Sequence, residues 1–428
     1  MARQNWHRAK RSAPPRRLTV RIDEIAAGGD GVALVEGARV FVPLTAPGDA
    51  AEIEARGERG TLISVTTPGP DRAEPPCRHY GRCGGCALQH VKADFYRAWK
   101  RGRVVSALAR EGFDAGLVAP LIETPAASRR RAAFAVTKRG GRTLVGFNAR
   151  RSSDIVDLED CRILHPDLLA RLDPVRSLAS TISADRFDLS LTLCDNGVNA
   201  AIAGDAVTEP VGAALSAVIS AMRAAGIVRL SLNGETIAAI ASPLVHFDGV
   251  PVSPPPGGFL QASREGEAAL ISLVRAAAGK ARKIADLFAG CGTFALPLAK
   301  IATVTAVDGD RASIEALATA AAAAQGAGMK INPVKTEMRD LFERPLTVKE
   351  LKGFDAIVFD PPRAGALMQA TEIARSRAPV VIGVSCNPVS FARDAAVLRD
   401  GGYELTEVTP VDQFVYSSHV ELVGVFRR

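Results

Sequence analysis

The chain changes its pattern after the run Ser253-Pro-Pro-Pro-Gly-Gly, and beyond it short apolar segments alternate with helix-like segments. This alternation is typical of a doubly wound parallel sheet with helices on both faces. Ligands of such sheets bind at the carboxyl ends of the strands. The residues directly after each predicted strand are therefore the first candidates for chemistry.

A single cysteine follows the apolar run 380–384 in Ser385-Cys386-Asn387-Pro388. The run predicts a buried strand, and Pro388 predicts a turn after it. Cys386 would then lie at the ligand-binding edge of the sheet, where its thiol could attack an electrophilic carbon. The alternative is a buried cysteine that only fills space, the commoner fate of free cysteines.

A cofactor pocket is predicted where Lys283-Ile-Ala-Asp-Leu runs into the turn 288–293. Gly290 and Gly292 would let a ligand approach the backbone. A second predicted strand ends about twenty residues later in Asp308, where a carboxylate can bind ribose hydroxyls. The turn lacks the third glycine of a dinucleotide-binding loop. Its pattern resembles the S-adenosylmethionine site of Rossmann-like methyltransferases.

Two more predicted strands carry an acid at one end. One reaches Asp360-Pro-Pro-Arg363, where Arg363 stands in place of the aromatic residue expected of enzymes that methylate exocyclic amines. The other is the last strand, which begins near Glu421 and follows His419. A carboxylate within such an apolar strand indicates a function, although a surface acid on an edge strand remains the alternative. For His419 we expect a structural hydrogen bond.

A cysteine and a carboxylate around one base suit methylation of uridine at carbon 5. That carbon becomes a competent nucleophile when a thiolate adds to carbon 6. A base must then remove the carbon 5 proton so that the thiol can leave. Cys386 and Glu421 would supply these two groups.

The first half of the chain predicts three further parts. Residues 1–14 form a basic arm, and residues 15–68 contain short, evenly spaced strands that predict a small β-barrel. Residues 69–255 predict a central α+β domain that begins with a cysteine cluster, and residues 256–428 form the α/β domain. Four cysteines in this region, Cys77, Cys83, Cys86 and the distant Cys161, could hold zinc or an iron–sulfur cluster, and their spacing alone does not decide between the two.

Charge and cysteine content bound the setting. The net charge is +7, with seven cysteines among 428 residues. Basic residues gather in three groups, within 1–21, 97–103 and 129–142. This clustering favours a polyphosphate partner, a nucleic acid, over a merely solubilising surface. With no secretion signal and an odd cysteine count, we expect a cytoplasmic protein that has no membrane partner and is a monomer.

Taken together, Asp360-Pro-Pro-Arg-Ala-Gly, Ser385-Cys-Asn-Pro and His419-Val-Glu421 resemble the RNA uridine-5 methyltransferase family. The resemblance covers nearly the whole chain. It implies an S-adenosylmethionine-dependent enzyme with a Rossmann-like methyltransferase domain, and it likens the barrel to a TRAM module, an OB-type RNA-binding domain. It also favours a [4Fe-4S] cluster over zinc, with a structural role.

The resemblance assigns roles to individual residues. Cys386 falls on the nucleophile and Glu421 on the base. Positions expected to bind the cofactor are Gln261, Phe288, Thr293, Asp308, Asp340 and Asp360. Those expected to hold the cluster are Cys77, Cys83, Cys86 and Cys161.

Methylation of 23S rRNA is the leading hypothesis. A tRNA target is an alternative, which the cluster cysteines disfavour because Gram-negative tRNA enzymes of this family look to lack them. An inactive RNA-binding assembly factor is a second alternative, and the presence of Cys386, Glu421 and Asp308 weighs against it. A cysteine hydrolase fits less well, because no histidine is evidently paired with Cys386.

Overall fold

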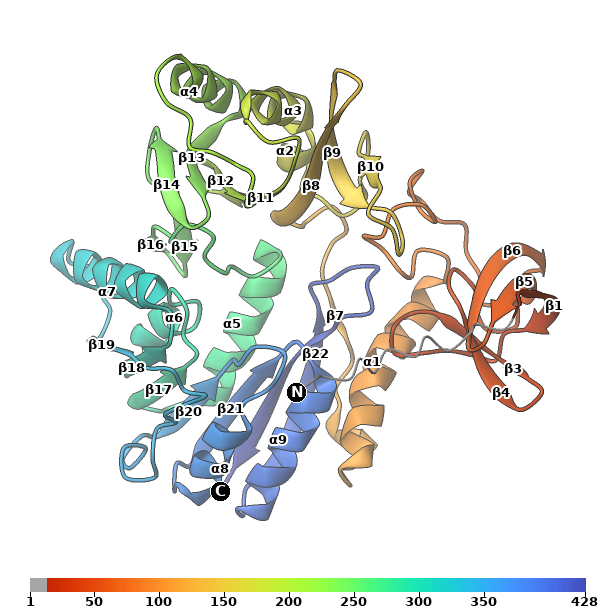
Figure 1. Ribbon diagram of the computed structural model, residues 1–428. Coiled ribbons are helices and arrows are strands. Elements are labelled where there is room, and N and C mark those ends of the chain that lie inside the picture. The colour runs from red at the N-terminus through yellow and green to blue at the C-terminus, as the bar shows by residue number, and fades with distance from the viewer. Residues whose placement is uncertain (1–13) are drawn as a thin grey trace, which may run out of the picture. The chain divides into compact units, whose positions relative to one another are not determined.

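The computed structural model describes residues 14–428 (Figure 1). The chain divides into two compact units. The first contains the residues up to 81 with 85–97 and 416–418, and the second contains 82–84, 98–415 and 419–428. Of the predicted basic arm, residues 1–13 lie outside the described residues.

The first unit contains a six-stranded sheet in the order β1-β5-β6-β4-β3-β2, antiparallel except between β4 and β6. Asp49 is fully buried at its base and accepts hydrogen bonds from the Arg72 guanidinium and the Gly69 amide. These bonds hold the segment after β6 against the sheet. The strands are β1 (Arg16–Arg21), β2 (Glu24–Ile25), β3 (Gly31–Val35), β4 (Ala38–Val42), β5 (Ala50–Arg56) and β6 (Arg59–Thr67).

The second unit contains a seven-stranded sheet in the order β10-β9-β8-β11-β12-β13-β14. Helices α3 and α4 pack their apolar sides on it, with Val175 and Met222 fully buried against Leu191. A small hairpin, β15 (Val245–Phe247) with β16 (Val250–Val252), follows. The sheet and its helices are β8 (Arg131–Arg139), β9 (Arg142–Asn148), β10 (Ile155–Asp157), α2 (Pro166–Leu169), α3 (Leu172–Thr181), β11 (Arg186–Cys194), β12 (Gly197–Ala203), α4 (Ala213–Ala225), β13 (Ile227–Leu232) and β14 (Glu235–Ala239).

An eight-stranded sheet in the order β19-β18-β17-β20-β21-β23-β22-β7 forms the rest of the second unit. Alternate side chains along β17 point to opposite faces of the sheet. Ile284 packs with α5, α6 and α7, whereas Ala285 packs with α8 and α9. Its elements are β7 (Ile122–Glu123), α5 (Arg264–Ala278), β17 (Lys283–Leu287), α6 (Ala295–Ala299), β18 (Thr303–Asp308), α7 (Arg311–Gly326), β19 (Val334–Met338), β20 (Ala356–Phe359), α8 (Leu367–Arg375), β21 (Val380–Ser385), α9 (Pro388–Asp400), β22 (Glu404–Asp412) and β23 (Glu421–Arg427).

The predicted α/β sheet with helices on both faces is therefore confirmed. Two earlier segments also join it. Helix α1 (Ala93–Arg110) contributes Val104 and Leu108 to its core, and β7 pairs with β22. Within residues 14–428 no helix is both long and apolar enough to span a bilayer.

The direction of the strands gathers the predicted site at one edge. Strands β17 to β21 are parallel, and β23 runs antiparallel between β21 and β22. The last strand therefore begins at the edge where β20 and β21 end. This topology places the start of β23 beside the turn after β21.

Candidate active site

The glycine turn after β17 is tied to the acid at the end of β18. The Gly290 N–H donates to Asp308 Oδ2 over 2.8 Å, and the Asp310 N–H donates to Asp308 Oδ1 over 2.7 Å. The amides of Phe288 and Ala289 both donate to the carbonyl of Val307. These bonds hold Phe288 at a φ of 63°, a conformation that a bulky residue rarely adopts. Such strain is common at ligand sites.

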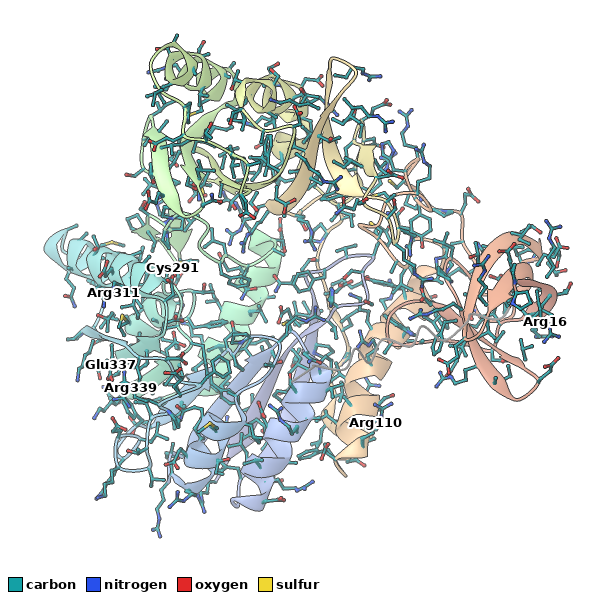
Figure 2. All side chains as sticks on the ribbon, in the orientation of Figure 1. Arg16, Arg110, Cys291, Arg311, Glu337 and Arg339 are labelled. Carbon is teal, nitrogen blue, oxygen red and sulfur yellow. The ribbon has the colours of Figure 1, made fainter. Side chains whose placement is uncertain are left out.

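The two glycines of this turn differ in their surroundings. A Cβ at Gly290 would have no atom within 4 Å, whereas a Cβ at Gly292 would lie 2.6 Å from Leu317 Cδ1. Gly290 therefore faces open space, and Gly292 allows α7 to pack closely. Cys291 between them is 2% exposed, and burial raises the pKa of its thiol to about 12 (Figure 2). This buried, packed position indicates a structural role for Cys291.

Three carboxylates gather around this turn. Asp286 is fully buried, and neither of its oxygens has a hydrogen-bond partner among residues 14–428. Burial and then the charges of Asp360 and Asp308 raise its pKa well above the usual range. The Ala295 amide lies close enough to oppose this rise, but outside hydrogen-bond geometry. A cationic ligand would relieve the repulsion, and S-adenosylmethionine carries both a sulfonium and an ammonium group, so these residues fit it.

An aromatic pair lies beside the turn. The rings of Phe288 and Phe342 have centroids 5.4 Å apart, and Phe342 remains 43% exposed. Asp340 accepts hydrogen bonds from the amides of Phe342 and Glu343 through Oδ1. The structure thus brings predicted Phe288 and Asp340 into one neighbourhood, where a flat heteroaromatic ring could bind. Thr293, also predicted, is half-buried at the end of the turn.

Cys386 and Glu421 meet across the sheet. Ser385 pairs with Leu422 in the antiparallel β21–β23 ladder, so the next position sets Cys386 opposite Glu421. Burial, followed by the charges of Glu421 and Asp360, raises the pKa of the Cys386 thiol to about 11, while Arg363 opposes this rise. Predicted nucleophile and base therefore share one site.

The carboxyl groups of Glu421 and Asp360 both have raised pKa values. Glu421 is 4% exposed, and burial and then Asp360 raise its pKa to about 8, while the Gln413 carboxamide favours the ionised form. Asp360 keeps some accessible surface, but protein atoms surround its carboxylate, and this desolvation raises its pKa to about 7. Both acids can therefore exchange a proton near neutral pH.

The loop after Asp360 is hydrogen-bonded to the segment that follows Cys386. Asn387 caps α9 and also donates from Nδ2 to the carbonyl of Arg363 over 2.9 Å, and Ser390 donates to the same oxygen. The Arg363 guanidinium lies 3.2 Å from His419 Nδ1. Burial, Arg363 and Lys100 together lower the pKa of His419 to about 4, so the ring is neutral and accepts this bond. The predicted structural role of His419 agrees with this contact.

The sequence did not single out two buried polar residues that shape the connection between β22 and β23. Lys100, predicted within a basic group suited to polyphosphate, is instead fully buried. Its Nζ donates to Asp412 Oδ1 over 2.7 Å and to the carbonyls of Phe414 and His419. Gln413 is 3% exposed and donates from Nε2 to Oε1 of predicted Gln261 over 2.7 Å. Their only signal in the sequence is a polar Asp-Gln pair directly after an apolar strand.

The role of the four cysteines as ligands of a metal cluster remains a prediction. Cys77 and Cys86 belong to the first unit, and Cys83 and Cys161 to the second. Cys83 is buried, and its backbone forms an isolated antiparallel β-bridge with Ala149. Cys161 packs beside the core of the central sheet. Within the described part of the chain, no three His, Cys, Asp or Glu side chains form a group ready to hold a metal ion.

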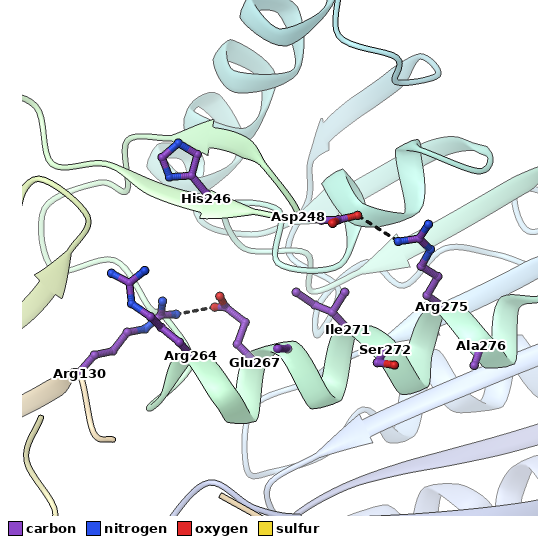
Figure 3. A pocket seen from close by; sticks show the side chains of 10 residues that line it. Arg130, His246, Asp248, Arg264, Glu267, Ile271, Ser272, Arg275 and Ala276 are labelled. Atoms are coloured by element: carbon purple, nitrogen blue, oxygen red, sulfur yellow. Dashed lines mark hydrogen bonds and ion pairs between the residues drawn. The ribbon is translucent and has the colours of Figure 1, made fainter. Parts of the chain in front are cut away.

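A separate cavity of about 610 Å³ lies along α5 (Figure 3). None of the predicted site residues lines it. Its arginines are paired with acids, Arg130 with Glu267 at 2.5 Å and Arg275 with Asp248 at 3.1 Å. The predicted site residues therefore lie outside this cavity.

Known proteins similar to this chain include RNA methyltransferases. The family model described as tRNA (Uracil-5-)-methyltransferase matches residues 257–428. An uncharacterized RNA methyltransferase of Rhizobium meliloti is 45% identical over 418 residues, covering 96% of this chain and 99% of the relative. The 23S rRNA (uracil(1939)-C(5))-methyltransferase RlmD of Pectobacterium atrosepticum is 31% identical over 435 residues, covering 97% and 95%.

A solved structure shares the fold over nearly the full length. The tRNA (uracil-54, C5)-methyltransferase of Pyrococcus abyssi, solved in complex with S-adenosyl-L-homocysteine, superimposes with a TM-score of 0.70 and 22% sequence identity. The match covers 96% of this chain and 100% of the archaeal one. At this identity the likeness establishes the fold.

Proposed function

The chain belongs to the RNA uracil-5 methyltransferase family and is an S-adenosylmethionine-dependent enzyme of that family, and from this premise we propose that it methylates carbon 5 of a uridine in 23S rRNA through a covalent cysteine adduct. The observation that carries the proposal is the register of β21 and β23, which sets Cys386 opposite Glu421. A thiol and a carboxylate on two sides of one base are what the reaction needs.

The residues of the site would act in sequence. The Cys386 thiolate adds to carbon 6 of the uracil, and the electron pair of the 5,6 double bond becomes an enolate. S-adenosylmethionine, when bound, supplies the methyl group that carbon 5 takes. Glu421 then removes the proton from carbon 5, the double bond re-forms, and the carbon–sulfur bond breaks to release the thiolate. Arg363 favours the thiolate electrostatically, because its charge opposes the rise in the pKa of Cys386.

The proposed cofactor positions follow the geometry of the carboxyl edge. Asp308, Phe288 and Asp340 lie around the glycine turn, and Asp360 lies between this turn and the thiol. Thr293 ends the turn, and Gln261 lies beside Gln413. Calorimetry with S-adenosylmethionine should show weaker binding for Asp308→Ala, with Asp355→Ala as a control outside this edge.

A covalent adduct tests the mechanism. RNA with 5-fluorouridine at the target cannot lose a proton from carbon 5, so it should trap as a complex that survives denaturing gels. Cys386→Ala should abolish the complex. Cys194→Ala is the matched control, because burial likewise raises the pKa of Cys194 to about 11 and its 3% exposure places it in the core. Trapping by Cys386→Ala, or no trapping by the wild type, would contradict the mechanism.

The choice of 23S rRNA over tRNA rests on the full-length relative named as a 23S rRNA enzyme, at 31% identity, against 22% for the solved structure of an archaeal tRNA enzyme. Methyl incorporation into purified 23S rRNA and into tRNA decides between them. Incorporation into tRNA alone would reverse the assignment. Mass mapping of 5-methyluridine in rRNA from a deletion strain would locate the nucleotide.

Two accessory features complete the proposal. The six-stranded sheet of the first unit would serve as a TRAM-type RNA-binding module, together with the basic arm. Four cysteines, Cys77, Cys83, Cys86 and Cys161, offer the tetrathiolate donor set of a [4Fe-4S] cluster. Iron and sulfide analysis of protein purified without oxygen tests this, and about four of each per chain is the expected content. Zinc in their place, or no metal, would contradict it.

A further inference from the structure

The basic group predicted at 129–142 separates into two kinds of residue in the structure. Arg130 is buried in an ion pair, and the Lys138 ammonium donates to two carbonyls at the end of α3. Arg139 and Arg142 are instead exposed, and neither forms an ion pair within the described part of the chain. These two arginines therefore have charge to offer a partner.

Arg139 and Arg142 lie at the tip of the β8–β9 hairpin. The turn between them is Gly140-Gly141, whose φ angles of 58° and 73° suit a tight two-residue hairpin. Because the register sets Arg139 directly opposite Arg142, their Cβ atoms lie about 5 Å apart. Like charges in this position destabilise a strand pair. A bound anion would remove that repulsion.

A third arginine extends the pair onto the next strand, β11 (Figure 1). Arg186 pairs with Thr137, and Thr137 lies two residues before Arg139, so all these side chains share one face of the sheet. The Arg186 guanidinium donates to the carbonyl of Ser153 over 2.7 Å and likewise forms no ion pair in the described chain. At about 4.8 Å between strands, Arg142, Arg139 and Arg186 form a row roughly 10 Å wide across β9, β8 and β11, called the arginine row.

The face that carries the arginine row is the one that the helices leave open. Phe134, Val136 and Phe187, on the opposite face, pack into the core with α3 and α4. On the open face Ala133 and Ala203 are exposed. The open-face positions of β8, β9 and β11 hold no aromatic residue. Such a flat surface lets a sugar–phosphate backbone come close but offers the bases no ring to stack on.

The charges of these strands favour an anion. Asp188 is the only acid in β8, β9, β11 and β12, against five basic residues. It lies two residues after Arg186 on the open face, where it is exposed and forms no ion pair with described residues. Arg176 of α3, by contrast, is paired with two acids. The open face therefore carries an excess of positive charge that the fold does not neutralise.

The arginine row lies away from the reacting groups, on a strand that leads to them. The N–H and Nε groups of Arg130, directly before β8, donate to the carbonyls of Ala262 and Gln261. These bonds tie the start of β8 to the segment before α5, where Gln261 is a proposed cofactor position. From Arg131 to Arg139 the strand spans about 27 Å. The row is therefore too distant to touch the reacting base and would meet the RNA beside it.

We propose that the arginine row and the open face of β8, β9 and β11 form a docking surface for RNA, which binds phosphates of the strand that flanks the target uridine. This inference rests on the proposed function. Phosphate contacts position an RNA without reading its sequence, and the guanidinium group holds phosphate through paired N–H donors. An acidic protein segment is the competing partner, and the experiment separates the two.

Arg139→Gln combined with Arg142→Gln removes two cations and keeps polar side chains at the turn. Filter binding with purified 23S rRNA and with a mixed-sequence RNA, over a range of salt concentrations, measures the effect. We expect the Kd for both RNAs to rise roughly tenfold. The slope of log K against log salt should become shallower by about 1 for each arginine lost, because fewer counterions are released.

Lys349→Gln combined with Lys352→Gln is the matched control. Both lysines are exposed and form no ion pair in the part of the chain that the structure describes. They precede β20, at the other end of the parallel strands from the predicted site. This variant loses the same charge, so it should keep the affinity and the salt slope of the wild type within about twofold.

Asp188→Asn should act in the opposite direction. It removes the one acid from the open face, so RNA binding should tighten by about threefold. A gain in affinity cannot come from a damaged fold. The thermal midpoint of the arginine variant should likewise stay unchanged or rise, because the repulsion between the opposed guanidinium groups is gone.

Methylation kinetics place the surface outside the reacting site. The KM for RNA should rise in the arginine variant, while kcat at saturating RNA and the Kd of S-adenosylmethionine stay unchanged. If that variant binds both RNAs as tightly as the lysine control and with the same salt slope, the proposal is overturned. Unaltered RNA binding together with lost binding to a polyglutamate peptide would also overturn it and would give the surface to an acidic protein.

A readout on the unaltered protein separates this proposal from the proposed function. Phenylglyoxal modifies exposed guanidinium groups, and mass spectrometry locates the modified residues. Bound RNA should protect Arg139 and Arg142, whereas Arg377, exposed ahead of β21, should react as in the free protein. Equal modification with and without RNA would refute the docking surface. A wild type that shows this protection but methylates no RNA would refute the proposed function alone.

Discussion

Glu421→Gln should stabilise the protein in alkaline solution and much less in acid. Burial and the charge of Asp360 raise the pKa of Glu421 from 4.5 to about 8. A group whose pKa is raised by folding contributes stability that is complete below its unfolded pKa and is lost as the pH rises through its folded pKa. The wild type therefore loses stability between about pH 5 and pH 9 through this one carboxyl, and glutamine, which never ionises, does not.

The magnitude follows from the same shift. Moving a single carboxyl pKa from 4.5 to about 8 removes roughly 4 kcal/mol of stability between pH 5 and pH 9. Asp360, whose pKa rises to about 7, shares the titration, so part of this belongs to the pair. We expect Glu421→Gln to gain about 2 kcal/mol over the wild type across this range. For the unit of about 330 residues that contains Glu421, this is about 3 °C in the unfolding midpoint.

Thermal unfolding at pH 5, 7 and 9, followed by circular dichroism, measures the effect. Glu350→Gln is a control of opposite sign, because the hydrogen bonds from Arg339 and Thr347 lower the pKa of Glu350 to about 2. Its stabilising effect is present at neutral pH and is lost in acid, so Glu350→Gln should lower the midpoint at pH 7 and above. Equal midpoint changes for Glu421→Gln at pH 5 and pH 9 would refute the reasoning.

Three further outcomes follow from the site and its supports. Because Glu421 must be ionised to take the carbon 5 proton and its pKa is about 8, the breakdown rate of the methylated adduct should rise roughly tenfold per pH unit between pH 6 and pH 8, and a flat profile for this step would exclude Glu421 as the base. Lys100→Met leaves Asp412 buried without its cation and should cost about 3–5 kcal/mol in urea unfolding, whereas Lys100→Met with Asp412→Asn should recover much of this. Gly292→Ala places a methyl group 2.6 Å from a methyl carbon of α7 and should lower the free energy of unfolding by about 1–3 kcal/mol, more than Gly290→Ala does in open space, as measured by thermal unfolding.

The sequence singled out the predicted site residues but not their arrangement. Glu421 stands out as an acid in an apolar strand, Cys386 as a cysteine directly after one, and their roles remain predictions. The sequence could not show that β23 inserts between β21 and β22, because strand pairing is a long-range property. That insertion is what sets the acid opposite the thiol.

Burial of polar residues was the other limit. Lys100 stands among Arg97, Arg101 and Arg103, and the sequence gives it no different character from them. Only the packed structure shows that it faces Asp412 inside the protein. Arg130 likewise belongs to a predicted basic group, yet it is 2% exposed and paired with Glu267. A cationic cluster in a sequence thus overstates the charge that is available to RNA.

The distribution of charge explains how one site could serve two ligands of opposite sign. The chain carries a net charge of +7, which favours a polyanionic partner at its surface. The carboxyl edge of the eight-stranded sheet gathers the acids Asp286, Asp360 and Glu421, and their raised pKa values mean that the ionised forms are disfavoured there. Such a site disfavours a further negative charge such as phosphate, whereas a cation such as a sulfonium would favour the ionised carboxylates. A nucleotide can therefore enter it only with its uncharged base, while its phosphates stay outside with the basic surface.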